Sequence, residues 1–175
     1  EEKEEEKEEE KVETAEVMPV PLQEIKEIAQ QAYLSKYYLD IKQPSQAIVK
    51  ILRGRELGIP PMMALEGIYV VEGRTAISSN LMAYLIKKGG KYDYAVKELT
   101  TEKCTIEFYG KGKLIGTSSF TMEDAKRAGL LGKTSWQRYP EDMLFARALS
   151  RGARRFCPDA LGGAIYTPEE LKEEG

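Results

Sequence analysis

Residues 91–120 read KYDYAVKELTTEKCTIEFYGKGKLIGTSSF, and three segments of this stretch have the composition of β-strands. Tyr92–Glu98, Cys104–Tyr109 and Leu114–Phe120 alternate polar with apolar residues or carry β-branched ones, which suits a pleated sheet with one buried face. Two glycines flank Lys111 and favour a tight turn between the second and third segments. The stretch therefore predicts a three-stranded antiparallel meander.

The residues before the meander predict helices and a hairpin. Apolar side chains recur at helical spacing from Leu22 onward, and the dipeptide Glu72-Gly73 between two short apolar runs is typical of a tight hairpin turn. The predicted order is a helix over 22–38, a helix over 45–57, a hairpin of Ile68–Val71 with Arg74–Ile77, and a helix from Ser78 or Ser79 to Gly89.

The residues after the meander predict helices only. Thr121–Asp124 resembles a capping box, Pro140 fits the first position of a long helix to about Phe156, and Thr167-Pro168 begins another helix. The predicted fold class is therefore α+β, with a β-hairpin and a three-stranded antiparallel meander buttressed by helices.

The net charge of −3 over 175 residues hides a strong asymmetry. Residues 1–16 hold ten glutamates and three lysines, a charge of −7, and residues 167–175 hold four glutamates and one lysine, a charge of −3. The interior therefore carries +7, which favours a polyanionic partner. We expect an acidic disordered arm and linker over 1–21, a DNA-binding core domain over 22–172 and a short tail over 173–175.

Composition excludes several classes of chemistry. The chain has no histidine, which removes Ser-His and Cys-His nucleophile pairs and His-ligated zinc. Cys104 and Cys157 lack metal-ligand spacing and are expected to be free thiols in a reducing compartment. No apolar run reaches the length of a transmembrane helix, so we expect no membrane partner.

Two motifs have the appearance of catalytic sites. Gly132-Lys133-Thr134 resembles the end of a phosphate-binding loop, but Arg127 occupies the position where the loop needs its first glycine. Asp159, Glu170 and Lys172 match the loose pattern of a magnesium-dependent nuclease, which needs both carboxylates at one metal ion. We keep the nuclease as the alternative function; helix-capping acids are the simpler interpretation of its two carboxylates.

Basic residues indicate a nucleic-acid site. Four arginines at i, i+4, i+7 and i+8 share one face of the helix after Pro140, where guanidinium groups can follow a sugar-phosphate backbone. Further basic residues surround the single tryptophan, a mixture that suits single-stranded nucleic acid. The candidate DNA-binding residues are Arg74, Lys126, Arg127, Lys133, Trp136, Arg138, Arg147, Arg151, Arg154 and Arg155. Solvated charges and a core tryptophan are the alternatives.

The segment from Trp136 to Tyr166 resembles the RecT/Redβ-type phage single-strand annealing proteins. It carries Trp-x-x-x-Pro-x-x-Met-Leu over 136–144, a basic residue three positions later, an Ala-Arg pair ending at Arg154, and Gly-Ala-Ile-Tyr over 163–166. The likeness extends over about 22–172, with Leu57-Gly-Ile-Pro60 and the glycine-basic turn at Arg74 in the same order. Glu66 and Asp142 depart from it, because they are acidic where some relatives carry basic residues.

The resemblance implies a recombinase that coats single-stranded DNA and anneals complementary strands without ATP, as a ring or helical filament of identical subunits. It implies that Arg147 and Arg154 contact the DNA backbone. We expect subunit contacts through the helices at 22–38 and 45–57, because an isolated subunit offers only a short site for DNA. No cofactor is expected, and magnesium would only modulate DNA binding. Besides single-stranded DNA and the annealed duplex, a partner exonuclease or a host single-strand-binding protein is expected to bind a region beyond this chain.

The expected setting is the cytoplasm of a bacterial, archaeal or phage-infected host cell. The chain begins at Glu1 rather than methionine, so we expect a trimmed protein or a fragment. We expect a binding protein rather than an enzyme; a structural or interaction protein that tolerates polyanions is the third possibility.

Overall fold

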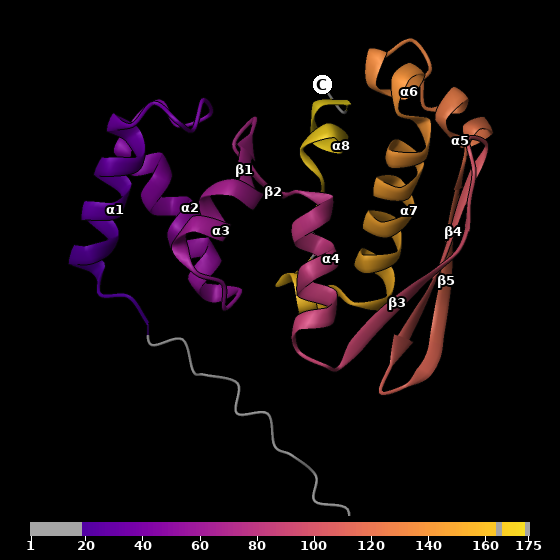
Figure 1. Cartoon of the computed structure of the whole chain (residues 1–175), viewed down its shortest axis with the longest axis horizontal. Coiled ribbons are helices and arrows are strands. Elements are labelled where there is room, and N and C mark those ends of the chain that lie inside the picture. Colours follow the sequence, from indigo (N-terminus) through magenta and orange to yellow (C-terminus); the bar gives the residue numbers. More distant parts are fainter. Residues whose placement is uncertain (1–18, 164–165, 174–175) are drawn as a thin grey trace, which may run out of the picture.

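A computed structural model of the chain describes residues 19–163 and 166–173, so the acidic residues 1–16 lie outside the described part. The fold is mixed α+β, with a two-stranded antiparallel sheet, a three-stranded antiparallel sheet and helices around both (Figure 1). The coarse class predicted from the sequence is therefore confirmed. None of the helices within 19–163 and 166–173 is long and apolar enough to cross a membrane.

The first three helices form a unit with its own core, which we call the helical unit (residues 19–67). It comprises α1 (Leu22–Leu34), α2 (Pro44–Glu56) and α3 (Pro61–Gly67). Its buried residues are Ile25, Ala29, Ala32, Ile41, Ala47, Ile51 and Leu65. The buried ammonium of Lys50 joins its parts, because it pairs with Asp40 at 2.8 Å and donates to the Leu65 carbonyl at 2.6 Å. Burial of a lysine is tolerated when its charge is paired in this way.

A β-hairpin follows, made of β1 (Ile68–Val71) and β2 (Arg74–Ile77). Glu72 and Gly73 adopt φ values of 51° and 77°, as expected for the turn that matches strand twist. α4 (Ser79–Lys88) begins directly after it, capped by the Ser78 hydroxyl, which accepts from the Leu81 amide.

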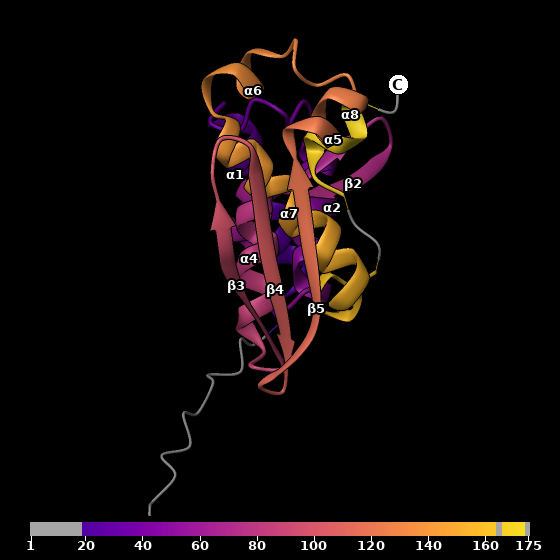
Figure 2. The same ribbon diagram turned by 90° about the vertical axis from the view of Figure 1, so that its right-hand side faces the viewer.

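The meander consists of β3 (Tyr92–Leu99), β4 (Lys103–Gly110) and β5 (Lys113–Thr121) in that spatial order. α7 (Pro140–Phe156) packs on β4 and β5, and α4 packs on β3, so helices cover one face of this sheet (Figure 2). Along β4, buried residues alternate with partly exposed ones, as period-two patterning requires.

Short helices complete the chain. α5 (Met122–Arg127) and α6 (Thr134–Arg138) lead into α7, and a 3-10 turn, η1 (Pro158–Leu161), and α8 (Pro168–Glu173) follow it. The segment before α8 returns to the hairpin, where the Ile77 amide donates to the Tyr166 carbonyl at 3.0 Å. α8 therefore lies against both the hairpin and α7.

The structure differs from the sequence prediction in three short helices and one boundary. α3, α6 and η1 were not predicted because each is too short to show helical periodicity, although a proline begins two of them. The first helix ends at Leu34 rather than 38, because Lys36 takes a left-handed φ of 58°.

Candidate nucleic-acid interface

α7 positions the predicted arginine row along the edge of its contact with the meander. Its inward side buries Leu144, Ala148, Leu149, Gly152 and Ala153. Because side chains three or four residues apart share a helical face, Arg147, Arg151 and Arg154 lie along one side of α7, where each is partly buried. The row exists as predicted, but only Arg155 at its end is exposed to solvent.

Arg151 is held in place by strand β5. Its guanidinium lies over the Phe120 ring, 4.7 Å from the ring centre, and donates to the Ser119 carbonyl at 3.1 Å. A guanidinium has five N–H donors, so four remain after this bond. Arg147 lies on the same ring at 5.9 Å, and burial lowers its pKa from the usual value for arginine. The two cations are therefore oriented by one aromatic platform before any ligand binds.

Trp136 supports that platform from inside the protein. Its side chain is 4% exposed, and its ring centre lies 6.0 Å from that of Phe120. The tryptophan therefore belongs to the core in this structure, and its ring is not placed to stack on a base. Phe120 was not among the residues predicted from the sequence. It lies two residues from Ser118 on β5, so the two side chains share the strand face that meets α7.

α5 contributes a third guanidinium, which is linked to Arg151 through the carboxylate of Asp124. Arg127 pairs with Asp124 at 2.8 Å. A hydrogen bond from the Thr121 amide, together with the charges of Arg151 and Arg127, lowers the pKa of the Asp124 carboxyl despite its burial. Asp124 is thus an ionised link between the cations of α5 and α7, and it leaves their combined charge positive.

Arg154 has a different environment from its neighbours in the row. It forms two hydrogen bonds to Glu170, both at 3.1 Å, and its guanidinium lies 4.3 Å from the centre of the Tyr166 ring. Glu170 is 8% exposed and also accepts from the Ser150 hydroxyl at 2.7 Å and the Thr167 amide at 2.8 Å. Arg154 therefore fastens α8 to α7, which differs from the backbone contact implied by the resemblance.

The Glu170 carboxylate is kept ionised by these partners. Burial by itself raises the pKa of a carboxyl group, but the charge of Arg154 and the hydrogen bonds from Thr167 and Ser150 outweigh it and lower the pKa of Glu170. The pair is thus a buried, fully hydrogen-bonded ion pair rather than a solvated one.

The other basic residues of the sequence prediction are exposed at several places. Arg74 lies on the β1–β2 hairpin, Lys126 and Arg127 on α5, Lys133 and Arg138 at the ends of α6, and Arg155 on α7. Arg147 and Arg151 share the Phe120 ring, and the charges of Arg151 and Arg127 both act on Asp124. We call these three arginines with Phe120 the arginine platform.

The residues of the nuclease alternative do not meet at one site. Asp159 accepts hydrogen bonds from Lys91 and Tyr92, each at 2.6 Å, at the start of β3. Glu170 is buried among different partners, and Lys172 is exposed. Within the described ranges, no group of three or more His, Cys, Asp or Glu residues is placed to hold a metal ion.

Comparison with known proteins adds no relative. The chain matches no protein-family model, no curated protein and no solved structure.

Proposed function

We propose that this protein binds single-stranded DNA along the arginine platform and anneals complementary strands without ATP, acting as an oligomer with the fold of the single-strand annealing proteins. The observation that carries the proposal is the pair of α7 guanidiniums, Arg147 and Arg151, held on one aromatic ring beside Arg127. The sequence pattern over 136–166 supports the same function independently.

The platform suits a phosphate backbone better than a base edge. Guanidiniums match phosphate oxygens through paired N–H donors, and within residues 19–163 and 166–173 Arg151 uses one donor, at Ser119. Because the rings beneath are buried, the exposed chemistry is cationic rather than aromatic. Such a surface neutralises phosphates and leaves base edges free to pair with a second strand, which is what annealing requires.

A salt titration of DNA binding tests the platform. Log affinity falls by about 0.7 per neutralised phosphate for single strands, so Arg127, Arg147, Arg151 and Arg155 together predict a slope of about −2.8 against log salt. Replacing Arg147 and Arg151 with alanine should halve the slope to about −1.4 and weaken binding to all sequences alike. Fluorescence anisotropy with a labelled oligonucleotide measures both quantities.

Two further variants distinguish the effect of charge from that of guanidinium stacking, and charge on the platform from charge elsewhere on the protein. Arg147→Lys with Arg151→Lys keeps both charges but loses the planar stacking, so the slope should stay near that of the native protein while the affinity falls. Lys26→Ala with Arg55→Ala removes the same net charge from exposed positions of α1 and α2 and should leave the slope unchanged. An unchanged slope in the Arg147→Ala, Arg151→Ala protein refutes the platform.

The function itself is tested by mixing two complementary oligonucleotides with the protein in the absence of nucleotide. Faster duplex formation with strands of unchanged length supports annealing. Strand shortening in magnesium that disappears in Glu170→Ala would instead support the nuclease. Absence of DNA binding at low salt would support the third possibility, a structural or interaction protein.

A further inference from the structure

An apolar groove of about 580 Å³ lies between α1, the turn that follows it, and α3. Its volume falls within the range of ordinary binding pockets. Its apolar lining is formed by Ile28, Ala32, Tyr37, Tyr38, Met62 and Leu65. Tyr37 is 74% exposed and Met62 is 55% exposed, which is far more than either side chain has in a protein core. The groove is therefore a surface that an apolar partner would cover.

The rim of this groove is acidic. Glu24 and Glu27 line it from α1, and Glu66 is close enough that its charge adds to burial in raising the pKa of Tyr38. Two lysines are adjacent in sequence to lining residues: Lys26 lies between the two glutamates, and Lys36 lies over the Tyr33 ring at 4.4 Å, but neither lines the groove. An occupant must therefore combine apolar side chains with positive charge, which excludes the glutamate-rich residues 1–16 of the same chain.

The tip of the β4–β5 hairpin has the complementary chemistry. Lys111 and Lys113 are exposed there, next to Leu114, which is 55% exposed, and Ile115, which is 41% exposed. The turn is firmly built, because Lys111 and Gly112 take the left-handed φ values of 51° and 75° and the Lys111 amide donates to the Lys91 carbonyl at 2.9 Å. A preformed tip loses little entropy on docking.

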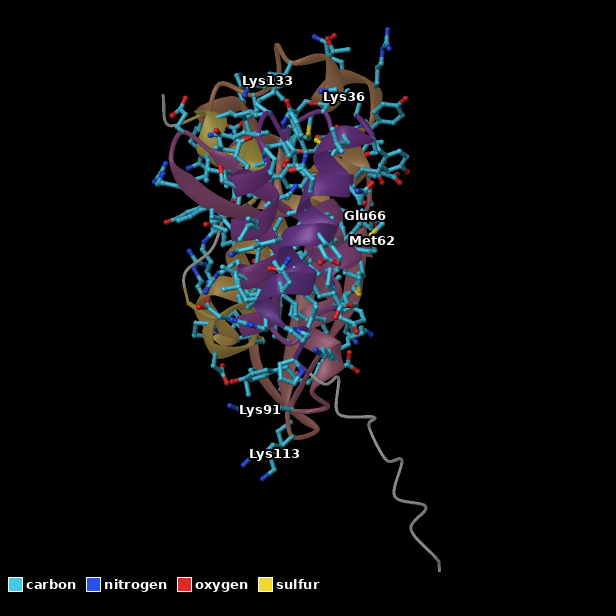
Figure 3. The ribbon with its side chains drawn as sticks, turned by 90° about the vertical axis from the view of Figure 1, so that its left-hand side faces the viewer. Lys36, Met62, Glu66, Lys91, Lys113 and Lys133 are labelled. Carbon is cyan, nitrogen blue, oxygen red and sulfur yellow. The ribbon has the colours of Figure 1, made fainter. Side chains whose placement is uncertain are left out.

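The groove and the tip are far apart in one molecule. Figure 1 shows α1 and the β4–β5 turn at opposite sides of the fold, and Figure 3 shows Lys113 at the projecting end of the hairpin with Met62 and Glu66 on the flank of the helical unit. The two surfaces can therefore meet only between molecules. Because they are different surfaces, their contact is head-to-tail and repeats from copy to copy.

We propose that the β4–β5 tip of one copy docks in the α1–α3 groove of the next, with Leu114 covering the apolar lining and the two lysines facing Glu24 and Glu27. The inference rests on the proposed function only in expecting an oligomer, since the contact involves no DNA. A hairpin tip is small compared with a standard protein interface, so we expect assembly to rise with protein concentration and to weaken with salt.

Sedimentation velocity without DNA tests this contact. The native chain should form species above its monomer mass of 19.7 kDa. Leu114→Asp places a charge on the apolar surface of the tip, and Met62→Asp places one in the apolar lining of the groove. Each variant alone should therefore stay monomeric. An equal mixture should form dimers and nothing larger, because the native tip of one variant still fits the native groove of the other. Val49→Asp, at an exposed position of α2 away from the groove, should assemble like the native chain.

A monomeric native chain, or assembly of Leu114→Asp equal to that of the native chain, overturns the proposal, as does a mixture that stays monomeric. Thermal melts of each variant show whether it remains folded. Glu24→Lys with Glu27→Lys, mixed with Lys111→Glu and Lys113→Glu, should restore assembly that each charge-reversed protein lacks. DNA binding is measured separately, so loss of assembly with retained binding distinguishes this contact from the DNA site.

Discussion

Replacing Arg154 with alanine should destabilise the fold, because this arginine is the charged partner of a buried carboxylate. Glu170 would keep its bonds from Ser150 and Thr167 but lose both bonds from the guanidinium. Breaking a buried pair from one side costs about 3–5 kcal/mol, and the remaining bonds place this site near 3 kcal/mol. For a chain of this size the loss lowers Tm by about 6–12 °C.

The dependence on pH gives a second test of the same pair. In the native protein the pKa of Glu170 lies below its ordinary value of 4.5, so the pair contributes its full stability above that pH and loses it as the pH falls through the lowered pKa. Without Arg154, the pKa of Glu170 rises from its native value, because the largest effect that opposes burial is lost. The carboxyl then becomes neutral at a higher pH, and the difference in unfolding free energy between the two proteins should shrink on acidification.

Urea unfolding of four proteins measures the coupling. These are the native chain, Arg154→Met, Glu170→Leu and the double variant that combines these two substitutions. The double variant should be less destabilised than the sum of the two single variants, because neither charge is then left buried without its partner, although Ser150 and Thr167 still lose their acceptor. If Arg154→Ala has the same urea midpoint as the native chain while its affinity for DNA falls, Arg154 contacts DNA and does not hold α8 against α7.

Three other outcomes are expected. Gly152→Ala should lower Tm, because the added Cβ would come within 2.1 Å of the Phe108 ring and overpacking costs about 1–3 kcal/mol; a native Tm would show that the ring moves aside. Cys104 and Cys157 should resist thiol reagents until the chain unfolds, because burial raises the pKa of each thiol to about 11; rapid labelling of the folded chain contradicts this. Deleting residues 1–16 should raise the affinity for single-stranded DNA at low salt, because a segment of charge −7 competes for the cations; equal anisotropy titrations would identify a tail without effect on binding.

Much of the fold follows from local patterns. The hairpin, the meander and the helix from Pro140 to Phe156 are predicted because strand alternation, turn glycines and a helix-starting proline act over a few residues. The capping box at Thr121 is confirmed by reciprocal bonds with Asp124. Both cysteines are free, as predicted, and both are buried.

The candidate site was predicted less completely. Helical spacing correctly places Arg147, Arg151 and Arg154 on one face, but spacing carries no information about what lies opposite that face. Glu170 and Phe120 come from segments 16 residues after and 27 residues before their arginine neighbours Arg154 and Arg147, and only chain folding brings them together.

The sequence by itself determined the order of the strands and the longer helices, the basic interior between two acidic ends, and the absence of histidine chemistry, since each depends on composition or on neighbours along the chain. Tertiary structure alone decided which cations are structural and which face outward. In the described part of the chain, Trp136 is a core residue, Arg154 pairs with Glu170, and an apolar groove opens between α1 and α3. The physical reason is that burial and ion pairing depend on distances between segments remote in sequence, which no local pattern encodes.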